Sequence, residues 1–145
     1  MSRVLLVGAG PLPGPGQRRV GFPQLRTAWL ARALGAGGHD VALACLRRGE
    51  GGPPTEPGPL AATVRDIAAE RGAWIEELRA LGRAWKPDAW VAAGPYTPPQ
   101  AAALAVGEEP LWADIPGDPF AEAQALAARL GPTGEPLPAA PGAAH

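Results

Sequence analysis

A single cysteine, Cys45, is present among the 145 residues of this chain. One cysteine excludes an internal disulfide and a zinc site built from several cysteines of the same chain. An excess of either charge is also lacking, because 13 Lys and Arg residues against 14 Asp and Glu residues leave a formal net charge of -1. The sequence therefore has no electrostatic footprint for binding nucleic acid or an anionic membrane surface.

The N-terminus lacks the basic leader, long apolar core and small-residue cleavage site of a secretory signal peptide. Residues 89–107 carry no charge over about the length of a membrane span. Three prolines interrupt that stretch, at positions 95, 98 and 99, so it fits a strand, a loop and the start of a helix better than a span. We expect a cytoplasmic protein with no transmembrane segment.

Glycine and proline are abundant, with 20 and 19 copies, which is a content typical of low-complexity chains. The chain is nevertheless 46% hydrophobic, and its apolar residues fall in periodic blocks. Short apolar runs bounded by glycine, proline or charged residues predict buried strands. We expect these strands at residues 3–8, 40–46, 88–93 and 110–113.

Apolar residues at helical spacing alternate with the strands. Thr97 and Asp118, each followed by proline, have the residue types that begin helices. The alternation predicts an α/β fold, a Rossmann-like parallel sheet of about four strands with helices on both faces. We expect one incomplete domain over residues 1–131 and a disordered Pro/Gly/Ala tail over 132–145. The helices are expected at residues 22–36, 59–85, 97–106 and 120–130.

Ligands of such sheets bind beyond the carboxyl ends of the strands, and the loop after the first strand is rich in glycine. Its segment Gly8-Ala-Gly-Pro-Leu-Pro13 matches only part of a dinucleotide fingerprint, because proline replaces the third glycine and no helix follows directly. The second strand ends in Arg47-Arg48, which argues against an acidic ribose clamp but leaves contact with a 2′-phosphate open.

Two other classes of phosphate-binding domain are excluded, because the residues that they require are missing from the sequence. Lys86 is the only lysine, and it lies outside any P-loop motif. Gly8 and Gly94 end the first and third expected strands, where a phospho-receiver domain would need acids.

Two groups of polar residues remain candidates for a site. Arg18 and Arg19 precede the first helix, near Arg26. They form either a solvated patch or, with the helix N-terminus, an anion-binding site. Asp114 ends the fourth expected strand. It could act as a general base, hold a substrate hydroxyl, or accept a hydrogen bond in a turn.

The order of several segments resembles the N-terminal domain of retaining, two-domain glycosyltransferases with the GT-B fold. The resemblance covers about residues 3–130, and its individual motifs are moderately specific. Gly-His-Asp-Val, for instance, resembles the opening of the second strand in those domains. The segments that carry the resemblance are residues 4–7, 21–34, 38–41, 86–93 and 110–124.

The resemblance implies the acceptor-binding half of a hexosyltransferase that is not active alone. A nucleotide-sugar donor would bind a missing C-terminal domain, no cofactor would bind this chain, and the partner would be a sugar or lipid-linked acceptor. The chain is shorter than the proteins of this family, and it lacks the Glu-x7-Glu pattern of their donor-binding site. A non-catalytic module that binds a partner or an anionic ligand stays open as the alternative. The implied catalytic residue is Asp114, and the implied acceptor-lining residues are Gly10, Gly14, Gly16, Gly94, Pro95 and Tyr96.

Overall fold

The computed structural model describes residues 1–14, 21–47, 63–67, 71–94, 97–115, 117 and 124–125. The chain divides into two units, Met1–Ile115 and Pro116–His145. In the second unit, Gln124 and Ala125 are helical. The rest of the helix expected at 120–130 and the tail expected at 132–145 lie outside the described residues.

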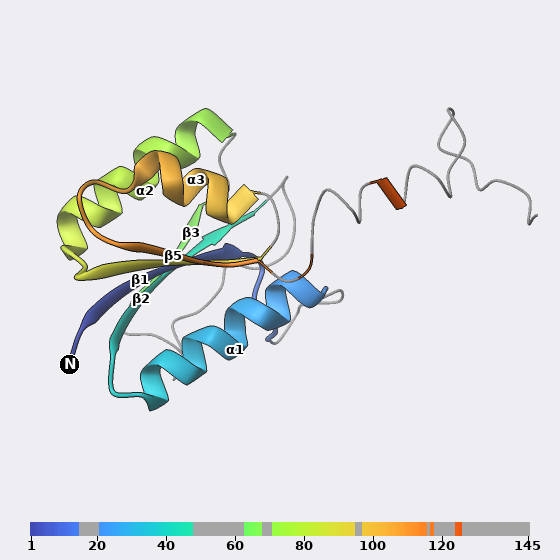
Figure 1. Cartoon of the computed structure of the whole chain (residues 1–145), viewed down its shortest axis with the longest axis horizontal. Coiled ribbons are helices and arrows are strands. Elements are labelled where there is room, and N and C mark those ends of the chain that lie inside the picture. Colours follow the sequence, from blue (N-terminus) through green and yellow to red (C-terminus); the bar gives the residue numbers. More distant parts are fainter. Residues whose placement is uncertain are drawn as a thin grey trace, which may run out of the picture. The chain divides into compact units, whose positions relative to one another are not determined.

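A parallel sheet of five strands forms the first unit, in the order β3-β2-β1-β4-β5 (Figure 1). Every neighbouring pair of strands is parallel. The Rossmann-like parallel sheet predicted from the sequence is therefore confirmed, with one strand more than expected. The strands are β1 (Arg3–Ala9), β2 (Asp40–Leu46), β3 (Thr63–Ile67), β4 (Ala89–Ala93) and β5 (Leu111–Asp114).

The additional strand, β3, corrects the prediction of one long helix over residues 59–85. The helix α2 covers only Arg71–Trp85, whereas Thr63–Ile67 pairs with β2. Val64 and Ile67 lie three residues apart, which fits a helical stripe equally well, and a short apolar run does not distinguish the two periods. The β-branched side chains of this segment favour a strand, and pairing with β2 buries Ile67.

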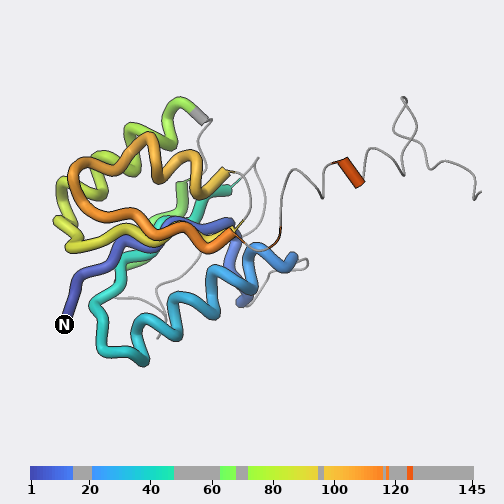
Figure 2. Tube along the Cα trace, in the orientation of Figure 1, coloured from blue at the N-terminus to red at the C-terminus, as the bar shows by residue number. Residues whose placement is uncertain are grey.

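Helices cover both faces of the sheet, as predicted (Figures 1 and 2). The helix α1 (Phe22–Ala36) lies on one face, and α2 lies on the other with α3 (Thr97–Ala105). Alternate residues of β1 serve the two cores: Leu5 belongs to the cluster with α2 and α3, and Leu6 to the cluster with α1. Burial on both faces explains why the three inner strands, β1, β2 and β4, consist mostly of apolar residues.

In the described part of the chain, no helix combines the length and the apolar character needed to cross a membrane. The prediction that residues 89–107 form a strand, a loop and a helix start is confirmed for the described residues, because β4 ends at Ala93 and α3 begins at Thr97.

Candidate functional site

The boundary between β1 and β4 is a topological switch point. The helix that follows β1 covers one face of the sheet, and the helix that follows β4 covers the opposite face (Figure 1). The connections that follow β1 and β4 therefore leave the sheet towards opposite faces. Open α/β sheets bind ligands in the crevice that forms at such carboxyl ends. The ends of β1, β4 and β5 confirm the expected position of Gly10, Gly94 and Asp114 at this edge. Their roles in binding or catalysis stay predictions.

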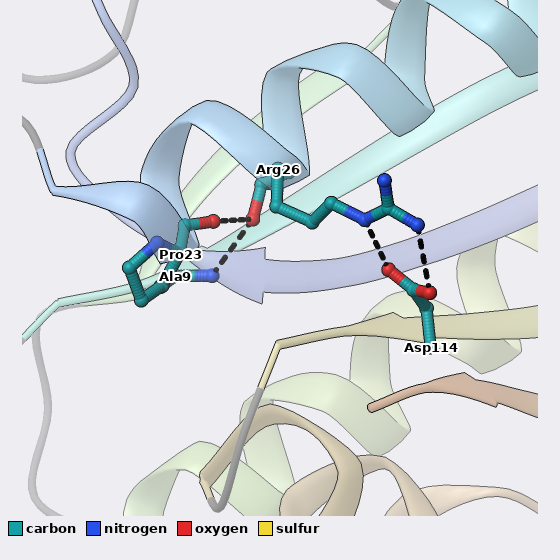
Figure 3. Close-up of polar contacts among 5 residues, drawn as sticks. Ala9, Pro23, Arg26 and Asp114 are labelled. Carbon is teal, nitrogen blue, oxygen red and sulfur yellow. Dashed lines mark hydrogen bonds and ion pairs between the residues drawn. The ribbon is translucent and has the colours of Figure 1, made fainter. Parts of the chain in front are cut away.

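A close contact fixes the start of α1 against the end of β1. A Cβ at Gly8 would overlap the side chain of Thr27 in α1, and Thr27 is completely buried. Its hydroxyl donates to the carbonyl oxygen of Pro23 at 2.9 Å and accepts from the amide of Ala9 at 3.2 Å (Figure 3). This packing holds the first turn of α1 beside the carboxyl edge.

Two of the four glycines expected to line the site, Gly10 and Gly94, lie next to different strands. The amide of Gly10 donates to the carbonyl oxygen of Leu46, the last residue of β2, at 2.9 Å. Gly94 follows β4 with a φ of +103°, which favours glycine, and its amide donates to the carbonyl oxygen of Asp114 at 2.9 Å. Among the described residues, no atom lies within 4 Å of where a Cβ of Gly14 would be.

An ion pair between Arg26 and Asp114 spans the switch point. The Nε of Arg26 donates to Oδ2 of Asp114 at 2.6 Å, and Nη2 donates to Oδ1 at 2.9 Å (Figure 3). The side chain of Arg26 is 35% exposed and that of Asp114 is 13% exposed. The bidentate geometry links α1 to the outer strand β5, while the side chain of Arg26 stays partly exposed.

The hydrogen bonds from Arg26 lower the pKa of Asp114, and the positive charge lowers it further, although partial burial opposes the shift. The same hydrogen bonds and charge raise the pKa of Arg26. Both carboxylate oxygens accept hydrogen bonds from a permanent cation, so Asp114 is a weak proton acceptor in this state. The geometry favours a role in holding Arg26 over a role as general base.

A second pair of opposite charges lies farther along the same edge. Nε of Arg47, after β2, is 4.0 Å from Oδ2 of Asp66 in β3, and both side chains are largely buried. Asp66 is not among the expected site residues, because the sequence predicts a helix where the structure has β3. The carboxylate of Asp66 accounts for the charge of Arg47, which had been considered for a 2′-phosphate.

The remaining predicted site residues lie outside the part of the chain that the structure describes. Among the residues that it does describe, no group of three or more His, Cys, Asp or Glu side chains is arranged to hold a metal ion. The predicted residues without a description are Gly16, Arg18, Arg19, Pro95 and Tyr96.

The ion pair predicts how stability depends on pH. Because the folded state lowers the pKa of Asp114, its contribution to stability is complete above the ordinary value of 3.8 and is lost as the pH falls below it. We expect the native chain to melt at a higher temperature than Asp114→Asn at pH 7, and this advantage to shrink towards pH 3. Thermal melts across that range provide the measurement. An advantage that stays constant down to pH 3 would contradict the pairing.

No protein-family model matches the chain, and no curated protein matches it. Among solved structures, the chain is similar to the DNA/pantothenate metabolism flavoprotein from Streptococcus pneumoniae, with 16% sequence identity and a TM-score of 0.39. The similarity covers 63% of this chain and 38% of that chain. A likeness at this level carries no argument about function.

Proposed function

We propose that this chain is the acceptor-binding half of a GT-B-type glycosyltransferase that acts in the cytoplasm. In this proposal, a sugar or a lipid-linked acceptor binds at the carboxyl edge of the sheet, beside β1 and β4. The nucleotide-sugar donor binds a separate domain outside these 145 residues, and transfer occurs where the two domains face each other. No cofactor held by this chain takes part.

The observation that carries the proposal is the bidentate Arg26–Asp114 pair at the switch point. The segments that resemble GT-B domains cover most of β1 and α1, the start of β2, and β4 and β5. These strands are parallel and end at this edge. The pair connects α1 with β5 at that place. Such a site supplies a rigid, charged hydrogen-bond donor beside two glycine turns, which suits the orientation of an acceptor hydroxyl.

Within this proposal, Asp114 is a positioning residue and Arg26 contacts the acceptor. Asp114 holds the guanidinium in one orientation, and the exposed part of Arg26 donates a hydrogen bond to an acceptor oxygen. This assignment replaces the general-base role, because the pKa of Asp114 is lowered by the hydrogen bonds from Arg26.

A specific observation also favours the non-catalytic character of the alternative, a module that binds a partner or an anionic ligand. Of the described acids at this edge, Asp66 and Asp114 each lie beside an arginine. Neither carboxylate is therefore placed to remove a proton, and binding without chemistry would satisfy the same geometry. The two functions differ in the ligand that they require.

Ligand titrations followed by ¹H–¹⁵N NMR separate the two functions. We expect maltose or octyl glucoside, used below its micellar concentration, to shift the amide resonances of Gly10, Gly94 and Asp114. Neither UDP nor inorganic phosphate should shift them. The variant Arg26→Lys keeps the charge but loses the bidentate fork, so we expect it to weaken sugar binding by about tenfold.

The matched control is Arg32→Lys, because Arg32 is exposed on the same helix. This variant should leave the affinity for sugar unchanged. A response to phosphate but to neither sugar would replace the glycosyltransferase proposal with the anion-binding module. A lack of response at these three amides to every probe would refute both.

A further inference from the structure

A cavity lies at the opposite, amino edge of the sheet, away from the site described above. It has a volume of about 410 Å³, within the range of small-molecule sites. It is open to solvent, and the C-terminal turns of α2 and α3 and the start of β4 line it. The lining residues are Arg79, Gly82, Arg83, Lys86, Pro87, Trp90, Ala105, Val106, Gly107 and Glu109.

One wall of this cavity is apolar and aromatic. Trp90 is only 2% exposed, and a Cβ at Gly82 would come within 2.6 Å of its Cζ2 and 3.7 Å of its Cε2. The edge of the indole that includes Cε2, the atom bonded to Nε1, therefore faces the Gly82 wall. Glycine is unfavourable inside a helix by about 1 kcal/mol relative to alanine, and at this position it allows the close approach of the indole.

The indole Nε1–H of Trp90 has no hydrogen-bond partner among the described residues. The indoles of Trp74 and Trp85 are in the same state. Nε1 of Trp90 is itself buried, so a ligand in the cavity would contact the ring of Trp90, and the indole N–H resonance would report that contact.

The rim of the cavity is positively charged. Arg79 is engaged by Glu76 and by the carbonyl oxygen of Leu104. Within the described part of the chain, no acidic side chain pairs with Arg83 or Lys86. Glu109 is the acid of the rim, and its Oε2 accepts from the amide of Gly107 at 3.0 Å.

We propose that this cavity binds a small planar organic anion, an apolar ring that bears one carboxylate or phosphate group. The ring packs against Trp90, Pro87 and Val106, and the anionic group lies between Arg83 and Lys86. Two cations without acidic partners select the negative charge, and the aromatic wall selects the ring. The proposal does not depend on the function of the carboxyl edge.

The test follows the indole N–H resonance of Trp90 in the ¹⁵N-labelled chain. The sequence has five tryptophans, so the variant Trp90→Phe assigns the resonance by removing it. Benzoate and phenyl phosphate distinguish the two anionic groups on one ring, benzyl alcohol supplies the ring without charge, and inorganic phosphate supplies charge without the ring. We expect at least one of the two ring-bearing anions to shift the resonance and to bind more tightly than either incomplete probe.

The double variant Arg83→Gln/Lys86→Gln should raise the Kd for that anion by about tenfold or more. Arg32→Gln/Arg65→Gln is the matched control, since it removes two exposed positive charges elsewhere and should change the Kd by less than about twofold. A resonance that moves with neither anion overturns the proposal. Equal binding of benzyl alcohol, equal binding of inorganic phosphate, or an unchanged Kd in Arg83→Gln/Lys86→Gln overturns it as well.

Discussion

Replacement of Leu5 by alanine is expected to lower the free energy of unfolding by about 2–5 kcal/mol. Leu5 is completely buried in β1, which is the central strand between β2 and β4. Its side chain belongs to the cluster formed with α2 and α3. Loss of the side chain removes apolar contacts and leaves a cavity that neighbouring strands fixed by backbone hydrogen bonds cannot fill. Urea unfolding provides the measurement.

The chain offers a matched control for this substitution in Leu104→Ala. Leu104 is in α3 and is 59% exposed, so the same change of side chain should cost less than about 0.5 kcal/mol. If both variants lose the same stability, or if Leu5→Ala is nearly neutral, the central position of β1 is wrong.

The sequence was sufficient to predict the elements whose residues are buried on both faces. The block Asp40–Leu46 is an uninterrupted apolar run after its first residue, and β2 has the expected bounds. By contrast, β3 is an edge strand with Arg65 and Asp66 among its five residues. An edge strand needs fewer apolar side chains, so its pattern resembles that of the helix that follows.

The sequence predicts the position of the site but not the ion pair between Arg26 and Asp114. The sequence predicts Asp114 at the carboxyl edge, because this residue directly follows an apolar run. For Arg26, it indicates only a position near the basic residues of the first loop. Their ion pair joins residues that are 88 positions apart, and no local pattern encodes such a contact. It depends on the strand order, because β5 must lie beside β4 before Asp114 can reach α1.

The second large effect concerns Gly8, whose replacement by alanine is expected to cost about 1–3 kcal/mol. The new methyl group would overlap Thr27, which is completely buried and anchors the first turn of α1 through Pro23 and Ala9. Either α1 must move away from β1 or Thr27 must leave its position. Both changes displace Arg26, so the shift of α1 should also weaken its pair with Asp114. Urea unfolding measures the loss of stability, and the pH dependence described for Asp114 measures the loss of the pair.

A double-mutant cycle with Thr27→Ala identifies the cause. Thr27→Ala removes the two atoms nearest to the position of the new methyl group, although Cβ remains 2.9 Å away. We therefore expect Gly8→Ala to cost less in the Thr27→Ala background than in the native chain. Gly35→Ala is the control, because no atom of the described residues lies within 4 Å of where its Cβ would be. In the last turn of α1, this variant should be neutral or more stable by up to about 1 kcal/mol. Strictly additive costs for Gly8→Ala and Thr27→Ala would show that the two side chains do not meet, and α1 would then not be held against β1 by this contact.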